Sequence, residues 1–325
     1  MRMSFISKKK PVSIGWVTQA RWPYWNVMAS TRIRCLDIIR FLKTLDIKTG
    51  LYRNSGNYDI VIFQKSFSAE HYELAKRLSA AGTRIILDIN VNYFLKEGET
   101  AQVSEKQIKD LHRFLELTDT VLVSSHYLKS VADKFHTDIR YIPEHISTVG
   151  FHPPNRRSNP IKLLYCGYAL KAGDVLLIED VLQELSKEYD FEFIFVCEKD
   201  PALKLPVKTS YIKYRHKNLV KILRLGDIKI APRNLDNSYD LGHSFTKIGY
   251  PMSVGLPVVA SPVPSYKGSP ALLAATKEEW LNYLKLLIVN PTEYLSLSQK
   301  GISFVKENFS LKKIGHMYIE LFESL

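Results

Sequence analysis

The sequence predicts two α/β domains, each a parallel sheet covered by helices, facing each other across a cleft. Short runs rich in β-branched residues alternate with amphipathic segments along most of the 325 residues. The alternation breaks once, in the proline-rich segment 143–160, and then restarts. This length is long for one α/β domain and comfortable for two. We therefore expect two domains that divide near residue 153.

The first domain is expected to contain five strands and four helices. Residues 59–63 are a continuous apolar run, which is typical of a buried strand. An apolar stripe with helical spacing predicts a helix over residues 31–45. Ser104 and Gln107 have the spacing of a capping box, which predicts the start of a helix that ends at residue 117. The other expected elements are strands over 12–18, 84–89, 120–124 and 139–142, and helices over 68–81 and 128–135.

The second domain begins with a strand over residues 162–166 that ends at Gly167. Near its end, a helix over 244–254 leads through the tight turn Gly255-Leu256-Pro257 into a strand over 258–261. Ligands of such domains bind at the carboxyl edge of the sheet, because helix N-termini point there. The other expected elements are strands over 191–197, 210–213 and 227–231, helices over 175–185 and 218–224, and a helical tail from residue 277.

The composition is that of a globular protein with surplus positive charge. Forty-five Lys and Arg residues against 33 Asp and Glu residues give a net charge of +12. Such a surplus suits phosphate-bearing substrates or an anionic membrane face, and a merely basic surface is the alternative. The basic residues are dispersed and form no nucleic-acid module, which argues against nucleic acid as a partner. The lysines at 8–10 and the basic residues within 32–43 favour an anionic membrane surface.

The sequence also indicates a compartment. No run approaches the roughly 20 apolar residues that a membrane-spanning helix needs, and residues 1–11 lack the apolar core of a signal peptide. Cys35, Cys166 and Cys197 lie far apart in apolar stretches, which predicts buried free thiols. We expect a cytoplasmic protein that can also dock on the inner face of the plasma membrane.

The start of the helix over 244–254 has the features of an anion site. Ser244 and Thr246 can cap this helix, and the free N–H groups around Phe245 would then face the cleft. Lys247, one turn in, adds a positive charge beside the helix dipole. The alternative is an ordinary capped helix with a solvated lysine. Taken together, the three features predict a site for a diphosphate.

The segment 227–261 resembles the C-terminal signature of family-4 glycosyltransferases of the GT-B fold, which reads roughly K-S-x-x-K-x-x-E-Y-x-x-x-G-x-P-V-V-A-S. Ser244 and Lys247 match this signature in register, His243 replaces its first lysine, and residues 255–261 match its turn and strand. The resemblance implies two Rossmann-like domains. They would be an acceptor-side domain over 1–153, a donor-side domain over 154–310, and a final helix over 311–325 that crosses back to the first domain.

Two positions depart from the signature. Gly242 and Tyr250 stand where the family has a pair of acids associated with the sugar and ribose of the donor. Their replacement leaves open the donor sugar, and retention or inversion of anomeric configuration. It also leaves open an inactive relative that binds a nucleotide or a glycan. A nucleotide-sugar epimerase of the same build is a third alternative, although no paired acids support it.

Elsewhere the resemblance is looser. Gly167 and Lys171 lie where the family has a glycine turn and a phosphate-binding lysine. Ser30, Arg32 and Arg34 match an S-x-R-x-R helix start. The resemblance implies a nucleotide-diphosphate sugar, UDP- or GDP-linked, as the donor substrate, and no metal or other cofactor. It also implies a glycan or lipid-linked acceptor, as in the synthesis of cell-surface polysaccharide or glycolipid.

The catalytic roles follow from where these residues are expected. Lys171 and Lys247 would stabilise the leaving diphosphate. Asp88 ends a strand that faces the cleft and is the candidate general base, against the alternative of a structural aspartate. His145, at the exit of the first domain, is a second candidate. Four aromatic residues around the first strand and its loop would stack on an acceptor sugar or belong to the core: Trp16, Trp22, Tyr24 and Trp25.

Overall fold

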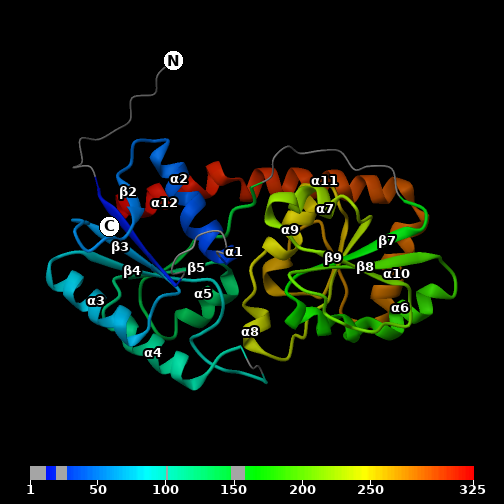
Figure 1. Cartoon of the computed structure of the whole chain (residues 1–325), viewed down its shortest axis with the longest axis horizontal. Helices are drawn as coiled ribbons and strands as arrows, with labels where there is room; N and C mark the ends of the chain where they lie inside the picture. The colour runs from blue at the N-terminus through cyan, green and yellow to red at the C-terminus, as the bar shows by residue number, and fades with distance from the viewer. Residues whose placement is uncertain (1–11, 20–27, 100–101, 148–157) are drawn as a thin grey trace, which may run out of the picture.

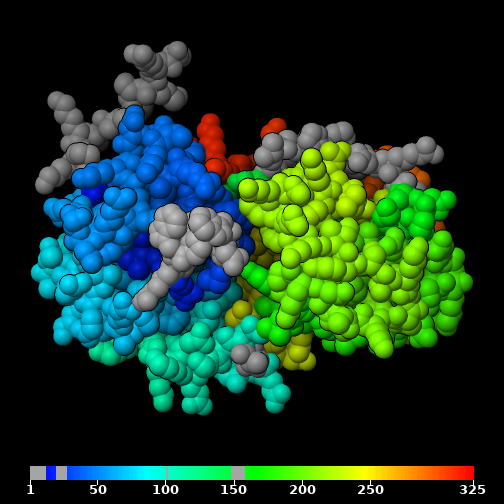
Figure 2. Space-filling view, viewed as in Figure 1, coloured from blue at the N-terminus to red at the C-terminus, as the bar shows by residue number. Residues whose placement is uncertain are grey.

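A computed structural model describes residues 12–19, 28–99, 102–147 and 158–325 and shows two domains side by side (Figures 1 and 2). Each domain contains one six-stranded sheet in which every strand pair is parallel, with helices on both faces. The expected fold class is confirmed. The expected boundary near residue 153 falls within 148–157, outside the described residues.

The first sheet has the order β2-β1-β3-β4-β5-β6. Its strands are β1 Ile14–Thr18, β2 Thr49–Leu51, β3 Ile60–Gln64, β4 Arg84–Ile89, β5 Thr120–Val123 and β6 Ile139–Tyr141. Its helices are α1 Ala29–Thr31, the π-helical turn η2 Arg32–Leu36, α2 Asp37–Lys43, α3 Ala69–Ala80, α4 Glu105–Leu115 and α5 His126–Ala132. The capping box of Ser104 and Gln107 is confirmed at the start of α4. The edge strand β2 was not expected, because three half-buried residues carry no apolar pattern.

The second sheet has the order β12-β11-β10-β7-β8-β9. Its strands are β7 Ile161–Cys166, β8 Phe191–Cys197, β9 Thr209–Lys213, β10 Ile228–Ala231, β11 Val258–Ala260 and β12 Leu272–Leu273. Its short helices are the 3-10 helices η3 Ala169–Ile178, η4 His216–Asn218 and η5 Pro264–Tyr266, with α6 Glu179–Ser186, α7 Leu219–Leu223 and α8 Ser238–Leu241. The helices α9 Thr246–Ser253, α10 Lys277–Val289, α11 Pro291–Phe309 and α12 Leu311–Ser324 complete the domain.

Three expected helices differ from the structure in their internal form. The helix over 31–45 contains the π-helical turn η2, and the helix over 175–185 begins earlier, as the 3-10 helix η3. The tail from residue 277 is helical, as expected, and consists of three helices. Asn290 and Ser310 each end one helix and cap the next, and Pro291 has no N–H to continue the preceding helix.

The final helix, α12, packs on the first domain beside α2 (Figure 1). Its apolar side chains join the core beneath β1, where Trp16 is buried and its ring centroid lies 5.8 Å from that of Tyr318. Trp16 is therefore a core residue, whereas Trp22, Tyr24 and Trp25 lie outside the described residues. The α12 residues in this core are Ile314, Tyr318, Leu321 and Phe322.

The domains also touch across the cleft. The Ser238 N–H donates to the Glu97 carbonyl oxygen at 2.9 Å, and the Glu97 N–H donates to the Ser238 hydroxyl at 3.1 Å. Gly98 has a φ of +72, in the left-handed region, and a Cβ there would overlap the Asp236 carbonyl oxygen. The loop before residue 100 is thus fastened to α8 of the second domain.

The described residues include no helix both long and apolar enough to cross a bilayer. Cys35 and Cys197 are buried and Cys166 is half-buried, and all three are free thiols. These observations agree with the expectation of buried, unpaired cysteines.

Candidate functional site

Positively charged side chains gather at the carboxyl edge of the second sheet, on the side that faces the first domain. They come from three elements that are distant in the sequence but meet at this edge. Lys171 lies on η3, Arg233 follows β10, and Lys247 lies in the first turn of α9. The sequence predicted that Lys171 and the 244–247 segment would meet, and the contacts described below join Lys171 to His243, directly before that segment.

Lys171 is held by the segment before α9. Its ammonium donates to Nε2 of His243 at 2.7 Å and lies 4.4 Å from the ring centroid of Tyr239. Because an ammonium can only donate, His243 must accept at Nε2 and donate from Nδ1 to the Tyr239 carbonyl oxygen, 3.0 Å away. Burial and the nearby Arg233 lower the pKa of Lys171 to about 7. His243 is neutral for the same reasons, which hold its pKa well below the usual value.

Arg233 is a site residue that the sequence reasoning missed. Its guanidinium is buried and forms an ion pair with Asp174 at 2.7 Å, and it lies 3.6 Å from Asp240. Its Nε is buried without a hydrogen-bond partner. Its position directly after β10, at the edge where ligands bind, was the signal that would have found it.

Lys247 points into the same cluster. Its ammonium lies 3.4 Å from the Tyr165 hydroxyl and 4.6 Å from the centroid of that ring. Burial, with Arg233 and Lys229 close by, holds the pKa of Lys247 well below its ordinary value. Such a group gains most from a bound anion, which offsets both effects.

The expected helix caps are wrong. The helix α9 begins at Thr246 with Phe245 as its N-cap, and no side chain caps it. The hydroxyls of Ser244 and Thr246 instead donate to Glu144, on the segment that leaves the first domain. The first N–H groups of α9 therefore lack a side-chain acceptor, while Ser244 and Thr246 join the two domains.

Two other expected ligand residues lie at the margin of the cluster. The Phe245 side chain is buried and stacks on Phe309, with ring centroids 4.3 Å apart, so it points away from the site. Gly167 follows β7, and a Cβ there would lie 2.8 Å from the Tyr165 hydroxyl. A glycine at 167 therefore leaves room for Tyr165 at the sheet edge.

The cluster has more cations than carboxylates. Among the described residues, the cations are Lys171, Lys229, Arg233 and Lys247, and the carboxylates that form ion pairs with them are Asp174 and Asp240. Buried charges of one sign are costly unless a partner of opposite sign is present. The surplus of positive charge thus suits an anionic ligand.

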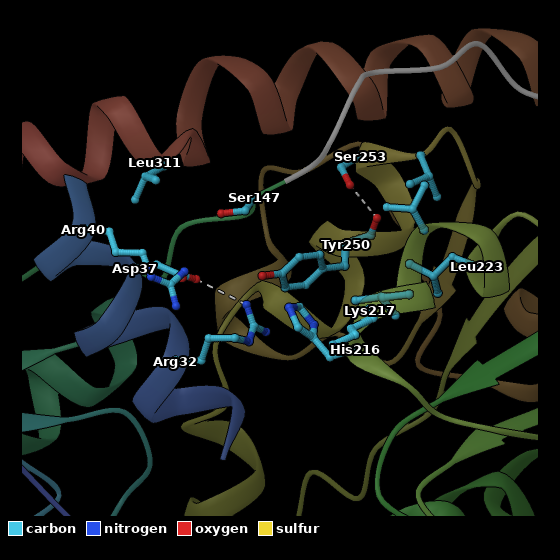
Figure 3. A pocket seen from close by; sticks show the side chains of 13 residues that line it. Arg32, Asp37, Arg40, Ser147, His216, Lys217, Leu223, Tyr250, Ser253 and Leu311 are labelled. Atoms are coloured by element: carbon cyan, nitrogen blue, oxygen red, sulfur yellow. Dashed lines mark hydrogen bonds and ion pairs between the residues drawn. The ribbon is translucent and has the colours of Figure 1, made fainter. Parts of the chain in front are cut away.

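A cavity of about 410 Å³ lies between the domains, lined by Arg32 and Asp37 of the first and by His216 and Tyr250 of the second (Figure 3). Tyr250, one turn beyond Lys247 on α9, points its ring toward Arg32 of the first domain (Figure 3). Gly242 faces the first domain as well, since a Cβ there would lie 3.0 Å from Leu128 and 3.3 Å from the Asn92 nitrogen. In this arrangement of the domains, a side chain at 242 requires Leu128 and Asn92 to shift slightly.

The first domain and its exit segment bury both candidate bases. Asp88 is fully buried, and Arg34 donates to its two oxygens at 2.6 to 2.9 Å, so neither oxygen is open to the cleft. His145 is also fully buried, with Nε2 3.5 Å from Asp37 and Nδ1 3.0 Å from the Ser147 hydroxyl. Both residues therefore lie inside the first domain and its exit segment.

Comparisons with known proteins rest on structure. No protein-family model matches the sequence, and a comparison with curated proteins finds no match. Among solved structures, HepE of Anabaena in complex with UDP and glucose has a TM-score of 0.67 at 12% identity, covering 97% of this chain and 100% of its own. Sucrose-phosphate synthase from Thermosynechococcus elongatus has a TM-score of 0.62 at 15% identity, covering 90% of this chain and 80% of its own.

TarM is a third similar structure, with a TM-score of 0.63 at 14% identity over 88% of this chain and 57% of its own. At such low sequence identity, these matches establish the fold alone. They extend over nearly all of the chain and agree with its two parallel six-stranded sheets. The chain therefore has the two-domain GT-B fold that these structures share.

Proposed function

We propose that this protein is a glycosyltransferase that moves a sugar from a UDP- or GDP-linked donor to a glycan or a lipid-linked acceptor. The observation that carries the proposal is the surplus of buried positive charge at the start of α9, at the sheet edge facing the other domain. Two similar structures are complexes of this kind, HepE with UDP-glucose and TarM with UDP, which supports a UDP-linked donor as the first to test.

The proposed chemistry is stabilisation of the leaving group. As the bond between the anomeric carbon and the donor phosphate breaks, negative charge develops on the departing diphosphate. Lys171, Lys247 and the uncapped N–H groups of α9 would neutralise that charge. The proposal assigns this task to side chains and the backbone, rather than to a metal ion.

The cavity of about 410 Å³ between the domains is proposed to receive the nucleoside of the donor. Tyr250 lies one helical turn from Lys247, so a nucleotide whose diphosphate contacts Lys247 can place its nucleoside beside Tyr250. His216 lines the same cavity from the second domain. Docking on an anionic membrane surface is also proposed. Of the basic residues expected there, Arg40 is 70% exposed and pairs with Asp37, whereas Arg34 is buried in its ion pair with Asp88 and Arg32 is 15% exposed. The lysines at 8–10 lie outside the described residues.

An inactive nucleotide-binding relative is the second candidate. Gly242 and Tyr250 replace both acids of the signature, and a side chain at 242 would be tightly packed against Leu128 and Asn92 of the first domain. Incubation with UDP- and GDP-sugars separates the candidates, because an enzyme releases UDP or GDP slowly even without acceptor. Binding without any turnover, with or without glycan acceptors, would favour the inactive relative.

The donor site is tested by Lys247→Ala. Removing this ammonium deletes a charge-assisted contact of roughly 1.5–3 kcal/mol. At about 1.4 kcal/mol per decade, calorimetric titration should show a roughly ten- to hundred-fold weaker nucleoside diphosphate. Lys277→Ala is the matched control, because Lys277 is half exposed and pairs with Asp180 on the same domain. Equal affinity of Lys247→Ala and the parent protein would place the phosphates elsewhere.

A further inference from the structure

Lys229 is a buried lysine in the middle of the second sheet. It lies on β10, opposite Leu164 of β7 and Val258 of β11, two apolar positions. Its strand neighbours Ile228 and Ile230 belong to the apolar core, and Lys229 itself is 0% exposed. A lysine is almost never fully buried unless it is paired.

The surroundings of Lys229 supply little compensation for its charge. Its ammonium lies 3.4 Å from the Cys166 carbonyl oxygen and 5.0 Å from the centroid of the Tyr165 ring. Among the described residues, no carboxylate forms an ion pair with it. The charged side chains that influence Lys229 electrostatically, Arg233 and Lys247, are positive as well.

Such an arrangement opposes folding. An ammonium removed from water and set among like charges costs free energy, and an apolar side chain of similar shape avoids that cost. Methionine, with a similar unbranched length, would fill this place in the sheet. The stability of the unliganded protein therefore does not explain the positive charge at position 229.

Tyr165 links Lys229 to the candidate donor site. Its ring interacts with Lys229 at 5.0 Å and with Lys247 at 4.6 Å, measured from each ammonium to the ring centroid. We propose that Lys229 is a positioning residue for the donor diphosphate. Its positive charge lies below the site, contacts the Tyr165 ring, and adds to the attraction that Lys247 exerts on the diphosphate. This inference rests on the proposed function.

The protonation of Lys229 agrees with this role. Burial lowers the pKa of Lys229 to about 8, with Arg233 contributing in the same direction and the Cys166 thiol opposing it. The ammonium is therefore the major form at pH 7. A diphosphate bound nearby stabilises that form and recovers part of the cost of its burial.

The test is Lys229→Met in the full chain, measured in two ways. Calorimetric titration with UDP, GDP and pyrophosphate should show roughly tenfold weaker binding than the parent, equivalent to about 1.4 kcal/mol. Urea unfolding without ligand should show equal or higher stability of the variant. Lys277→Met removes an exposed, paired lysine of the same domain and should change neither quantity appreciably.

The opposite movement of affinity and stability distinguishes this role from a structural one. Lys229→Met that unfolds more easily, or gives no folded protein, would show that the ammonium supports the fold, and would overturn the inference. Unchanged affinity of Lys229→Met for the probes would also overturn the inference about Lys229. The proposed function would still stand in that case, provided that the parent protein binds a probe. A parent protein that binds none of the three probes would refute the donor site itself.

Discussion

Replacing Asp88 by Asn is expected to destabilise the first domain rather than to abolish catalysis selectively. Arg34 and Asp88 form a bidentate ion pair with side-chain exposures of 1% and 0%. Burial alone would lower the pKa of Arg34, but the Asp88 carboxylate more than offsets this and leaves that pKa above its ordinary value. Asn at 88 preserves the shape and leaves the Arg34 charge buried without its counter-charge.

Breaking one side of a buried ion pair costs about 3–5 kcal/mol. At roughly 2–4 °C per kcal/mol, the midpoint of thermal unfolding should fall by about 10 °C. Urea unfolding of the parent and Asp88→Asn measures the loss directly. Asp110→Asn is the control, because Asp110 pairs with Lys106 on the exposed face of α4 and should lose less than about 1 kcal/mol.

A double variant sharpens this test. Arg34→Met with Asp88→Asn removes both charges and should recover much of the stability that the single change loses, because no unpaired buried charge remains. Asp88→Asn with parental stability and a loss of turnover would refute this reasoning. It would return Asp88 to the role of general base.

Two further outcomes are expected. Because the pKa of Lys171 is lowered to about 7, this lysine is charged below that pH and loses its charge above it. UDP should therefore bind up to about tenfold more weakly at pH 8 than at pH 6. Lys171→Arg should make UDP affinity independent of pH in this range, and a parental affinity that does not change with pH would contradict the prediction. Gly98→Ala should break the contact between the loop before residue 100 and α8, since a Cβ at this positive φ overlaps the Asp236 carbonyl oxygen. Small-angle scattering should then show a larger radius of gyration. An unchanged radius would refute the role of this contact in holding the domains together.

The sequence predicted those parts of the fold that local patterns determine. Buried strands such as β3 and β10 appear as continuous apolar runs. The turn before β11 is marked by Gly255, whose φ of +87 few other residues adopt. The edge strands β2 and β12 have three and two residues, which is too few to show a period.

Members of the cationic cluster were predicted where a motif is local and missed where membership depends on contacts between distant segments. Lys171 and Lys247 could be found from a glycine turn and a helix start. The pairing of Arg233 with Asp174 joins residues 59 positions apart. The contact of Ser244 with Glu144 joins two domains and replaces the helix cap that local spacing favoured. Whether Ser244 caps α9 or donates to Glu144 depends on how the two domains dock. The spacing of residues within one segment cannot reveal this.

The return of α12 to the first domain constrains the order in which the chain can fold during synthesis. Residues Ile314, Tyr318 and Phe322 fill a core that begins with Ile14. Because a ribosome makes the N-terminal part first, at roughly 5–20 residues per second, the first domain keeps apolar surface exposed until the 14 residues of α12 have left the exit tunnel. The first domain can therefore complete its core only after the second domain has been synthesised.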